Sequence, residues 1–478
     1  MSDANDGHGR RLSALDGSFL RNETPQAHMH VAWSAVFAAP GDAERPGVEA
    51  LRERAAGRLH EVPWCRWRLE GAPLGLSEPR WIDDPDFDLS ERIVGLTDPA
   101  DAVSPDAFEA LRSDLLSVPL DRSQPLWQIF LVPRLEDGRV GMVGKIHHAL
   151  VDGIAALQVV GLILDAEPDT ESQPVVRWHA DEPSGTLSQA ADVLTDAAGG
   201  GLRALQAGAG AVTRPKSTVR AALKGTSRVL RAAQKDVLPR APDSGLNVPI
   251  GARRTLVGYH ATREELRAAR AGSGGTLNDV GLAVVAGALR TLALRDGDPP
   301  EAPLKAMVPV SMRRADDTGA GNRISLVYVQ LPIHLDSPRD RMEWVRAQTR
   351  KLKHSDRAAG TQDLYRLSGL LPAPLRTPLA RVMTGPSAFN VTVSQSPGPR
   401  GTLHLLGCEM EEVYSVVPIG EGHALAIGMV RYRRELFFGC YADPEAFPAV
   451  RELPALLEAE LRALADASAP DDAQLSAT

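Results

Sequence analysis

The chain has 478 residues, of which 43% are hydrophobic and 24% are charged, and its formal net charge is -8. This length exceeds one typical hydrophobic core, so we expect two domains. The net negative charge argues against general nucleic-acid binding. Three scattered cysteines exclude a disulfide framework or a CxxC metal site and fit a reducing cytoplasm.

Apolar residues are not grouped as membrane insertion would require. No stretch reaches the ~18 uninterrupted apolar residues of a membrane-spanning helix. The first seven residues, MSDANDG, lack the charged-then-apolar pattern of a signal peptide. We therefore expect the protein to be made and kept inside the cell.

Mixed strand and helix patterns occupy the segment that we predict as the first half-domain, residues 1–175. Trp127 to Val132 and Val140 to Gly144 predict two strands, and Asp137-Gly138 between them predicts a hairpin turn. The second strand leads into the run KIHHALVDG, residues 145–153. A helix with one buried face is predicted from about Asp152, because apolar residues recur at helical spacing at Ile154, Leu157, Val160 and Leu164.

The two histidines of this run, His147 and His148, are candidates for acid-base chemistry. A neutral imidazole can take a proton from a hydroxyl near pH 7, so one of them is a candidate general base. Asp152 either orients a histidine or pairs with an arginine to hold the loop, and Gly153 permits a close backbone approach. The alternative, two histidines that merely cap a strand, is weaker because HHxxxDG is far more specific than a lone histidine.

Residues 176–249 are rich in proline, glycine, serine and alanine, which predicts a helical linker between two domains. Between Pro215 and Pro239 the pattern predicts a basic amphipathic helix. Such a helix could lie on an anionic membrane or a lipid inclusion, or it could be the solvated face of an ordinary surface helix. Its basic residues are Lys216, Arg220, Lys224, Arg228, Arg231 and Lys235.

The mixed pattern resumes over residues 250–463, the predicted second half-domain. Helices are predicted at 262–271 and 278–295, and strands at 254–260, 304–309, 324–333, 389–394, 424–432 and 436–441. The small polar tail, residues 464–478, is expected to be disordered. Two α/β halves joined by a long connection favour a site at their interface.

Several other short segments along the chain have specific residue patterns that can be compared with known families. They are LSALDGSFL from Leu12, Thr24-Pro25, His28-Met29-His30-Val31, Pro125-Leu126-Trp127, Asn278-Asp279, VPVSMR from Val308, and Gly321-Asn322-Arg323. HHxxxDG after a strand resembles the motif of the acyltransferase superfamily that includes chloramphenicol acetyltransferase and peptide-synthetase condensation domains. The other segments resemble the bacterial wax ester synthase/diacylglycerol acyltransferase family, and the similarity runs from about Leu12 to Leu461.

The resemblance implies an α/β (α+β) fold of two chloramphenicol-acetyltransferase-like half-domains with mixed sheets and an active-site channel at their interface. It implies an O-acyltransferase that moves a fatty acyl group from acyl-CoA to diacylglycerol or a long-chain alcohol, making triacylglycerol or wax ester without a covalent intermediate. Acyl-CoA would be a co-substrate and no cofactor is expected. The expected location is cytoplasmic, peripherally associated with a membrane or lipid inclusions, with no nucleic-acid partner.

The resemblance also distributes roles within the motif. His148 would be the general base, and His147 would be structural or would support it. Asp152, followed by Gly153, would anchor the loop through an arginine. Our candidate for that arginine is Arg313, for which a surface ion pair is the alternative.

Other residues are candidates for binding or positioning groups near the base. Asn278 could give an amide donor to the oxyanion or orient the base, and Asp279 could cap its helix through the carboxylate. Pro125-Leu126-Trp127 are predicted to shape the pocket, although a buried edge-strand tryptophan is the simpler explanation. His28 and His30 could line the channel or merely pack, and without a third ligand at suitable spacing we predict no metal.

Three segments depart from the family pattern. Ser394 to Pro399 read SQSPGP where Asn-Val-Pro-Gly-Pro is usual, Arg431 to Arg434 replace Ser-Tyr-x-Gly, and Ser90-Glu91 replace a tyrosine-histidine pair. These changes leave the catalytic motif intact but lie where a channel could be reshaped. Two alternatives therefore stay open: an acyltransferase of the same mechanism for a specialised hydroxyl or amine acceptor, and a non-catalytic lipid-inclusion-binding protein. No glycine-rich phosphate loop marks the site of the CoA nucleotide.

Overall fold

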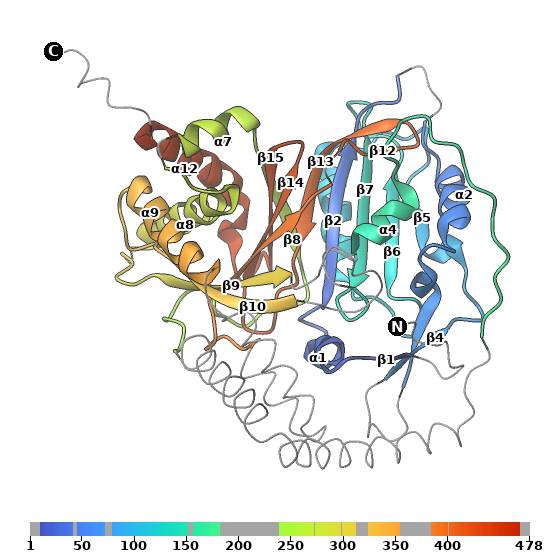
Figure 1. The fold of residues 1–478 in the computed structure, drawn as a ribbon, viewed down its shortest axis with the longest axis horizontal. Helices are drawn as coiled ribbons and strands as arrows, with labels where there is room; N and C mark the ends of the chain where they lie inside the picture. Colours follow the sequence, from blue (N-terminus) through green and yellow to red (C-terminus); the bar gives the residue numbers. More distant parts are fainter. Residues whose placement is uncertain are drawn as a thin grey trace, which may run out of the picture.

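The computed structural model describes residues 10–41, 45–71, 79–151, 156–181, 239–271, 273–297, 299–311, 324–353, 384–399 and 401–468. Within these residues two six-stranded mixed sheets stand side by side, and helices cover their outer faces (Figure 1). A smaller three-stranded sheet, in the order β1-β4-β3, lies beside the first of them. The predicted α/β class with mixed sheets is confirmed.

The first part of the chain supplies seven strands and four α-helices of the described structure. The strands are β1 (Arg10–Arg11), β2 (His30–Phe37), β3 (Trp67–Glu70), β4 (Arg80–Asp83), β5 (Ile93–Gly95), β6 (Trp127–Val132) and β7 (Val140–His147). The helices are α1 (Ala14–Asn22), α2 (Val48–Arg58), α3 (Pro105–Ser117) and α4 (Ala156–Ile163), with short 3-10 helices η1 (Pro63–Arg66) and η3 (Leu89–Glu91).

The second part begins after residue 239. Its strands are β8 (Thr255–Ala261), β9 (Leu304–Ser311), β10 (Ile324–Leu331), β11 (Val391–Pro397), β12 (His404–Leu405), β13 (Cys408–Val416), β14 (Leu425–Tyr432) and β15 (Glu435–Ala442). Its helices are α7 (Arg263–Arg270), α8 (Leu277–Arg295), α9 (Pro338–Lys353) and α12 (Leu453–Ser468), with the 3-10 helix η5 (Pro448–Glu452).

The central strand β7 is buried along its whole length. A glycine in its sequence allows neighbouring side chains to pack closely against it. Strand β2 pairs with it on one side and β6 on the other, both antiparallel. Gly144 is needed for this packing, because a Cβ at that position would come within 2.1 Å of the Trp33 ring. The strand therefore holds its carboxyl end, with the two histidines, in a fixed place.

The first sheet contains strands from both the first and the second part of the chain. The first sheet has the order β12-β13-β2-β7-β6-β5, and the second has the order β10-β9-β11-β14-β15-β8. Residues 404–416 thus belong to the first sheet, where Ser415 is the register partner of Trp33 in β2. The predicted second half-domain, residues 250–463, therefore gives one β-hairpin to the sheet of the first, and this exchange joins the two halves.

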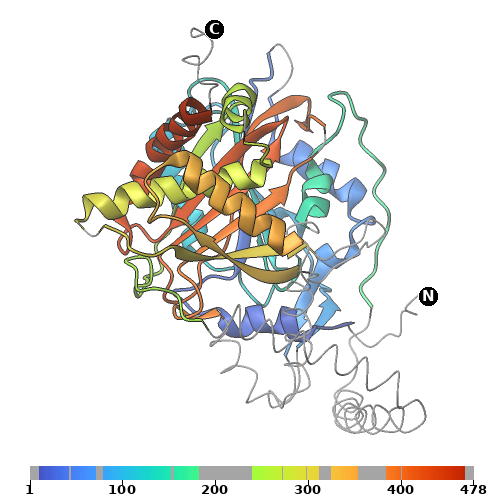
Figure 2. The same ribbon diagram turned by 60° about the vertical axis from the view of Figure 1, so that its left-hand side comes forward.

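Helix α8 is long and apolar enough to cross a membrane when judged by length and composition alone. However, 67% of its most apolar window is buried inside the structure. With α9 and α12 it covers the outer face of the second sheet, where these helices appear in yellow, orange and red (Figure 2). Burial of this kind is typical of a helix in a protein core.

Candidate active site

The chain turns immediately after β7, and the turn separates the two histidines. His147 is the last residue of the strand and is completely buried, whereas His148 is half-buried. The backbone N–H of His147 donates to Leu126 O at 2.9 Å, and that of His148 donates to Met29 O at 2.8 Å. Consecutive side chains of an extended chain point to opposite sides, so the two imidazoles face different surroundings.

Helix α1 supports the ring of His148. The Phe19 ring stacks on this imidazole with 4.0 Å between centroids and 5° between planes. The helix begins with a capping box, in which Ser13 and Asp16 satisfy each other's backbone N–H groups. The amino-terminal LSALDGSFL segment thus forms a well-capped helix that presents an aromatic ring to the candidate base.

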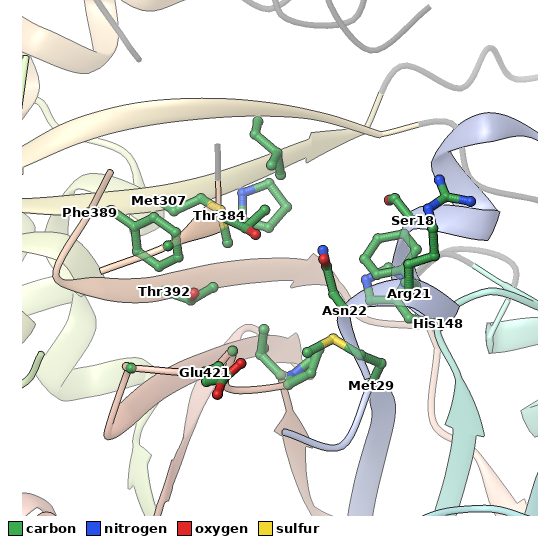
Figure 3. A pocket seen from close by; sticks show the side chains of 18 of the residues that line it. Ser18, Arg21, Asn22, Met29, His148, Met307, Thr384, Phe389, Thr392 and Glu421 are labelled. Atoms are coloured by element: carbon green, nitrogen blue, oxygen red, sulfur yellow. The ribbon is translucent and has the colours of Figure 1, made fainter. Parts of the chain in front are cut away.

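Two cavities meet at His148. The larger, about 330 Å³, is lined from α1 by residues such as Phe19 and Asn22 and from the second part of the chain by residues such as Phe389 and Thr392. Figure 3 shows these two groups of side chains facing each other, with His148 on the α1 side. The larger cavity therefore lies between the two halves.

The smaller cavity, about 160 Å³, is lined by residues of both sheets, among them Trp33, Ser394 and Val430. His148, Pro309 and Val417 line both cavities. Most other lining residues are apolar, so both spaces can admit hydrocarbon next to the same imidazole.

His147 is held by a carboxylate. Its Nδ1 accepts the backbone N–H of Ala149 at 3.0 Å, so a neutral ring carries its proton on Nε2. That nitrogen lies 3.3 Å from Glu23 Oε1, an ion-pair distance whose geometry falls short of a well-formed hydrogen bond. The Nε of Arg122 donates to the other oxygen of Glu23 at 2.7 Å.

Burial of Glu23 disfavours its charged form, but the contact with His147 and the charges of His147 and Arg122 outweigh this effect. The pKa of Glu23 is consequently lowered to about 2. Because Glu23 caps the end of α1, the same contacts hold both His147 and the helix that carries Phe19. Sequence reasoning missed Glu23, since only the fold brings it to His147.

His28 and His30 are buried, and neither is among the residues that line the two cavities. His28 contacts Pro25 O through Nε2 at 2.9 Å, and the two imidazoles stack at 5.7 Å. Burial lowers the pKa of both rings. The packing interpretation therefore fits their placement, and the channel-lining prediction does not.

Pro125, Leu126 and Trp127 also lie away from the two cavities. Trp127 is fully buried in β6, an interior strand of the sheet, and its indole N–H donates to Cys65 O at 2.7 Å. Leu126 O accepts the backbone N–H of His147. The segment therefore holds the end of β7 in place and does not line the two cavities, because Leu126 and Trp127 pack in the hydrophobic core around the first sheet.

Asn278 and Asp279 lie in the first turn of α8, on the outer side of the second sheet, and line neither cavity. Thr276 is the N-cap, and its backbone N–H donates to Asp279 Oδ2 at 2.7 Å. The other carboxylate oxygen accepts from Thr349 at 2.7 Å. The predicted capping role of Asp279 is confirmed, whereas the structure does not bring Asn278 to His148.

Asp152 and Gly153 of the loop lie outside the described residues, and so does Arg313, the predicted partner of Asp152. So do the basic segment from Lys216 to Lys235 and the tail from residue 469. Their predicted roles stay predictions.

Neither a thiol nor a metal cluster adds chemistry to the described site. Burial raises the pKa of Cys65, Cys408 and Cys440, and none of them lines either cavity. Among the residues that the structure describes, no three histidine, cysteine or carboxylate side chains are grouped to hold a metal ion. Of the two motif histidines, His148 is the one that lines the two cavities and could act as a base there.

Solved structures place this fold in a known class. The chain resembles the wax ester synthase/diacylglycerol acyltransferase of Marinobacter aquaeolei, with a TM-score of 0.67, 24% identity and coverage of 96% of this chain and 99% of that one. It also resembles the first condensation domain of the calcium-dependent antibiotic synthetase, with a TM-score of 0.58, 17% identity and 96% coverage of each chain. The fold is therefore that of the chloramphenicol-acetyltransferase-like class.

Sequence comparison identifies the family within this class. Residues 12–281 match the wax ester synthase/diacylglycerol acyltransferase catalytic domain, and residues 320–465 match the C-terminal domain of the same family. A Mycobacterium bovis protein named as a diacylglycerol O-acyltransferase is 31% identical over 470 residues, which cover 96% of this chain and 91% of the relative. A similarly named Mycobacterium tuberculosis protein is 30% identical over 466 residues, covering 95% and 98%. The chain belongs to the wax ester synthase/diacylglycerol acyltransferase family and is an acyltransferase.

Proposed function

We propose that the protein transfers a fatty acyl group from acyl-CoA to the free hydroxyl of diacylglycerol, with His148 as the general base. The observation that carries this proposal is the position of His148 where two mainly apolar cavities meet. A donor chain and an acceptor chain can then approach one imidazole from opposite sides. The names of the mycobacterial relatives support diacylglycerol as the acceptor.

In the proposed reaction His148 takes the proton of the acceptor hydroxyl as its oxygen attacks the thioester carbonyl. The tetrahedral intermediate collapses by breaking the C–S bond, and the proton passes from His148 to the leaving thiolate. The products are the ester and free CoA, so atoms and charges balance without an acyl-enzyme. The apolar lining supports this reaction, because it keeps out water that would compete with the acceptor.

The Asn22 amide is a candidate donor for the oxyanion, in place of Asn278. Asn22 lines the larger cavity, and Figure 3 shows its side chain directed into the cavity near His148. An amide donor aimed at the developing negative charge stabilises such an intermediate.

Purified protein incubated with palmitoyl-CoA should release CoA and form triacylglycerol when dioleoylglycerol is added. Parallel reactions contain hexadecanol, a long-chain amine or no acceptor. Wax ester formation with hexadecanol alone would move the assignment to the alcohol. Absence of product with every acceptor, from folded protein, would contradict the proposed function.

We also propose that the protein is cytoplasmic and attaches peripherally to a membrane or lipid inclusion through the basic segment between Pro215 and Pro239. The support is the recurrence of lysine and arginine every three or four residues and the insolubility of the proposed acceptor in water. Each basic residue near an anionic surface contributes about 1 kcal/mol.

Replacing the six basic residues of this segment by glutamine should therefore weaken sedimentation with vesicles containing phosphatidylglycerol by at least about tenfold. Binding to neutral phosphatidylcholine vesicles is the control. Turnover of a short-chain, water-soluble acceptor should not change. Undiminished sedimentation with the anionic vesicles would contradict the membrane proposal.

A further inference from the structure

Four arginines surround a third pocket, at the ends of β11 and β14. The pocket has a volume of about 870 Å³ and is lined by Arg263, Arg431, Arg433 and Arg434 together with polar and turn residues that include Gln395 and Thr402. All four arginines are exposed. Two of them replace the serine and glycine that are usual in the family, and the function as proposed above does not use them.

Within the described part of the chain, only one of these four arginines forms an ion pair. Arg433 pairs with Glu409. Among the described residues, no carboxylate lies within 4.0 Å of the guanidinium of Arg263, Arg431 or Arg434 in an ion pair. Guanidinium groups present several N–H donors in a plane and bind phosphate with two of them. The pocket is therefore suited to a ligand with more than one phosphate group.

The backbone of the β14–β15 hairpin supports a role for these charges. Arg433 and Arg434 have φ values of 50° and 70°, in the left-handed region. Glycine adopts this region without strain, whereas a residue with a side chain is disfavoured there. Arginine is thus kept at Arg434 at a cost in backbone energy, which points to function in the side chain.

The arginine pocket adjoins the route to His148. Ser396, Pro397, Gly398 and Pro399 line both this pocket and the smaller cavity, which His148 also lines. One step earlier in β11 the two spaces are separated by the strand, because Ser394 lines only the smaller cavity and its neighbour Gln395 lines only the arginine pocket. Gly398 lets the chain after β11 pack closely against β14, since a Cβ there would come within 2.0 Å of Arg431 O.

We propose that the arginine cluster binds the phosphate-bearing nucleotide end of the acyl-CoA donor. The pantetheine arm then passes the end of β11 at Ser396 to Pro399 and brings the thioester through the smaller cavity to His148, leaving the larger cavity to the acceptor. This assignment rests on the proposed function for its donor. A recess that shares its wall with the cavity of His148 fits a single ligand with an anionic head and a thin arm better than a flat lipid surface.

The double variant R431S/R434G tests the proposal, because it restores the residues usual in the family and removes two charges while easing the backbone at position 434. Isothermal titration with adenosine 3',5'-bisphosphate and with CoA measures binding without any turnover. We expect the dissociation constant for each to rise at least about tenfold, since one hydrogen-bonded contact to a charged group accounts for about that factor. R462S, which removes an exposed arginine of α12, is the matched control and should bind like the wild type.

Kinetics provide the second measurement. With palmitoyl-CoA the KM of R431S/R434G should rise about tenfold or more at an unchanged kcat. With palmitoyl-pantetheine, which lacks the nucleotide, wild type and variant should have equal KM values. Reduced binding of adenosine 3',5'-bisphosphate supports the nucleotide site even if no acceptor is found to be acylated, so this result is separable from failure of the proposed function.

Unchanged affinity of the double variant for adenosine 3',5'-bisphosphate would overturn the proposal. So would a variant that keeps this affinity but loses binding to phosphatidylglycerol vesicles, because the cluster would then bind lipid headgroups. A KM that rises equally for palmitoyl-CoA and palmitoyl-pantetheine would also contradict it, since the damage would then lie in the channel.

Discussion

Replacing His148 by alanine is expected to lower kcat by about 10²- to 10⁴-fold, the usual contribution of a general base. The physical reason is that a neutral acceptor hydroxyl is a weak nucleophile unless its proton is removed as it attacks. His148 is the imidazole shared by the two cavities, whereas His147 faces Glu23 in the core. The KM for acyl-CoA should change much less than kcat, because the cavity walls remain.

The matched control is H179A, which removes an exposed histidine outside both cavities and should keep wild-type activity. Thermal unfolding of both variants separates lost chemistry from lost structure. An H148A protein that is folded and retains most of the wild-type kcat would contradict the role of His148 as general base.

Replacing Glu23 by glutamine is expected to lower the free energy of unfolding at pH 7 by about 3 kcal/mol, since each pKa unit corresponds to 1.36 kcal/mol. The pKa of this carboxyl falls from 4.5 to about 2 in the folded protein. Its contribution is therefore fully present above about pH 4.5 and is lost as the pH falls towards 2. Urea unfolding at pH 7 and pH 3 should show a smaller difference between wild type and E23Q at the lower pH.

E49Q is the control for this experiment. Glu49 is 76% exposed and pairs with Arg52 at the surface, so its loss should change the unfolding free energy by less than about 1 kcal/mol. A difference between wild type and E23Q that is the same at both pH values would show that the pKa of Glu23 is not depressed by its partners. The structural account of His147 would then be wrong.

Local patterns allowed much of the fold to be predicted. The hairpin ending at the two histidines, the helix from Leu277 and the paired strands β14 and β15 follow from periodicity, turn residues and capping residues. Strand β13 and helix α9 were not predicted. The sequence of β13, CEMEEVYSV, carries three acidic side chains, so its apolar alternation is interrupted and it could not be recognised as an interior strand.

The candidate site could be predicted only in part, because its geometry depends on contacts between distant segments. The motif predicted that His147 and His148 matter, and alternation at the end of a strand explains why they face different surroundings. Asn278 was an expected partner, yet its helix packs on the outer face of the second sheet. Glu23 could not be linked to His147 from sequence, since no local periodicity relates positions so far apart.

The arginine cluster shows the opposite case, in which a departure from a family pattern became informative once the fold was known. Arg431 to Arg434 appeared in sequence as lost serine and glycine positions. In the structure they line a pocket that borders the smaller cavity. Side chains that are unusual for the family thus mark a specific place on the proposed path of the donor.

In the proposed mechanism donor and acceptor occupy the two cavities at His148 together, and the acyl group passes directly between them. Initial rates measured over a grid of palmitoyl-CoA and dihexanoylglycerol concentrations distinguish this mechanism from one with a covalent intermediate. We expect double-reciprocal lines that intersect, and no acylated protein in the mass spectrum after incubation with palmitoyl-CoA alone. Parallel lines, together with a stoichiometric burst of CoA in the absence of acceptor, would show a covalent acyl-enzyme and contradict it.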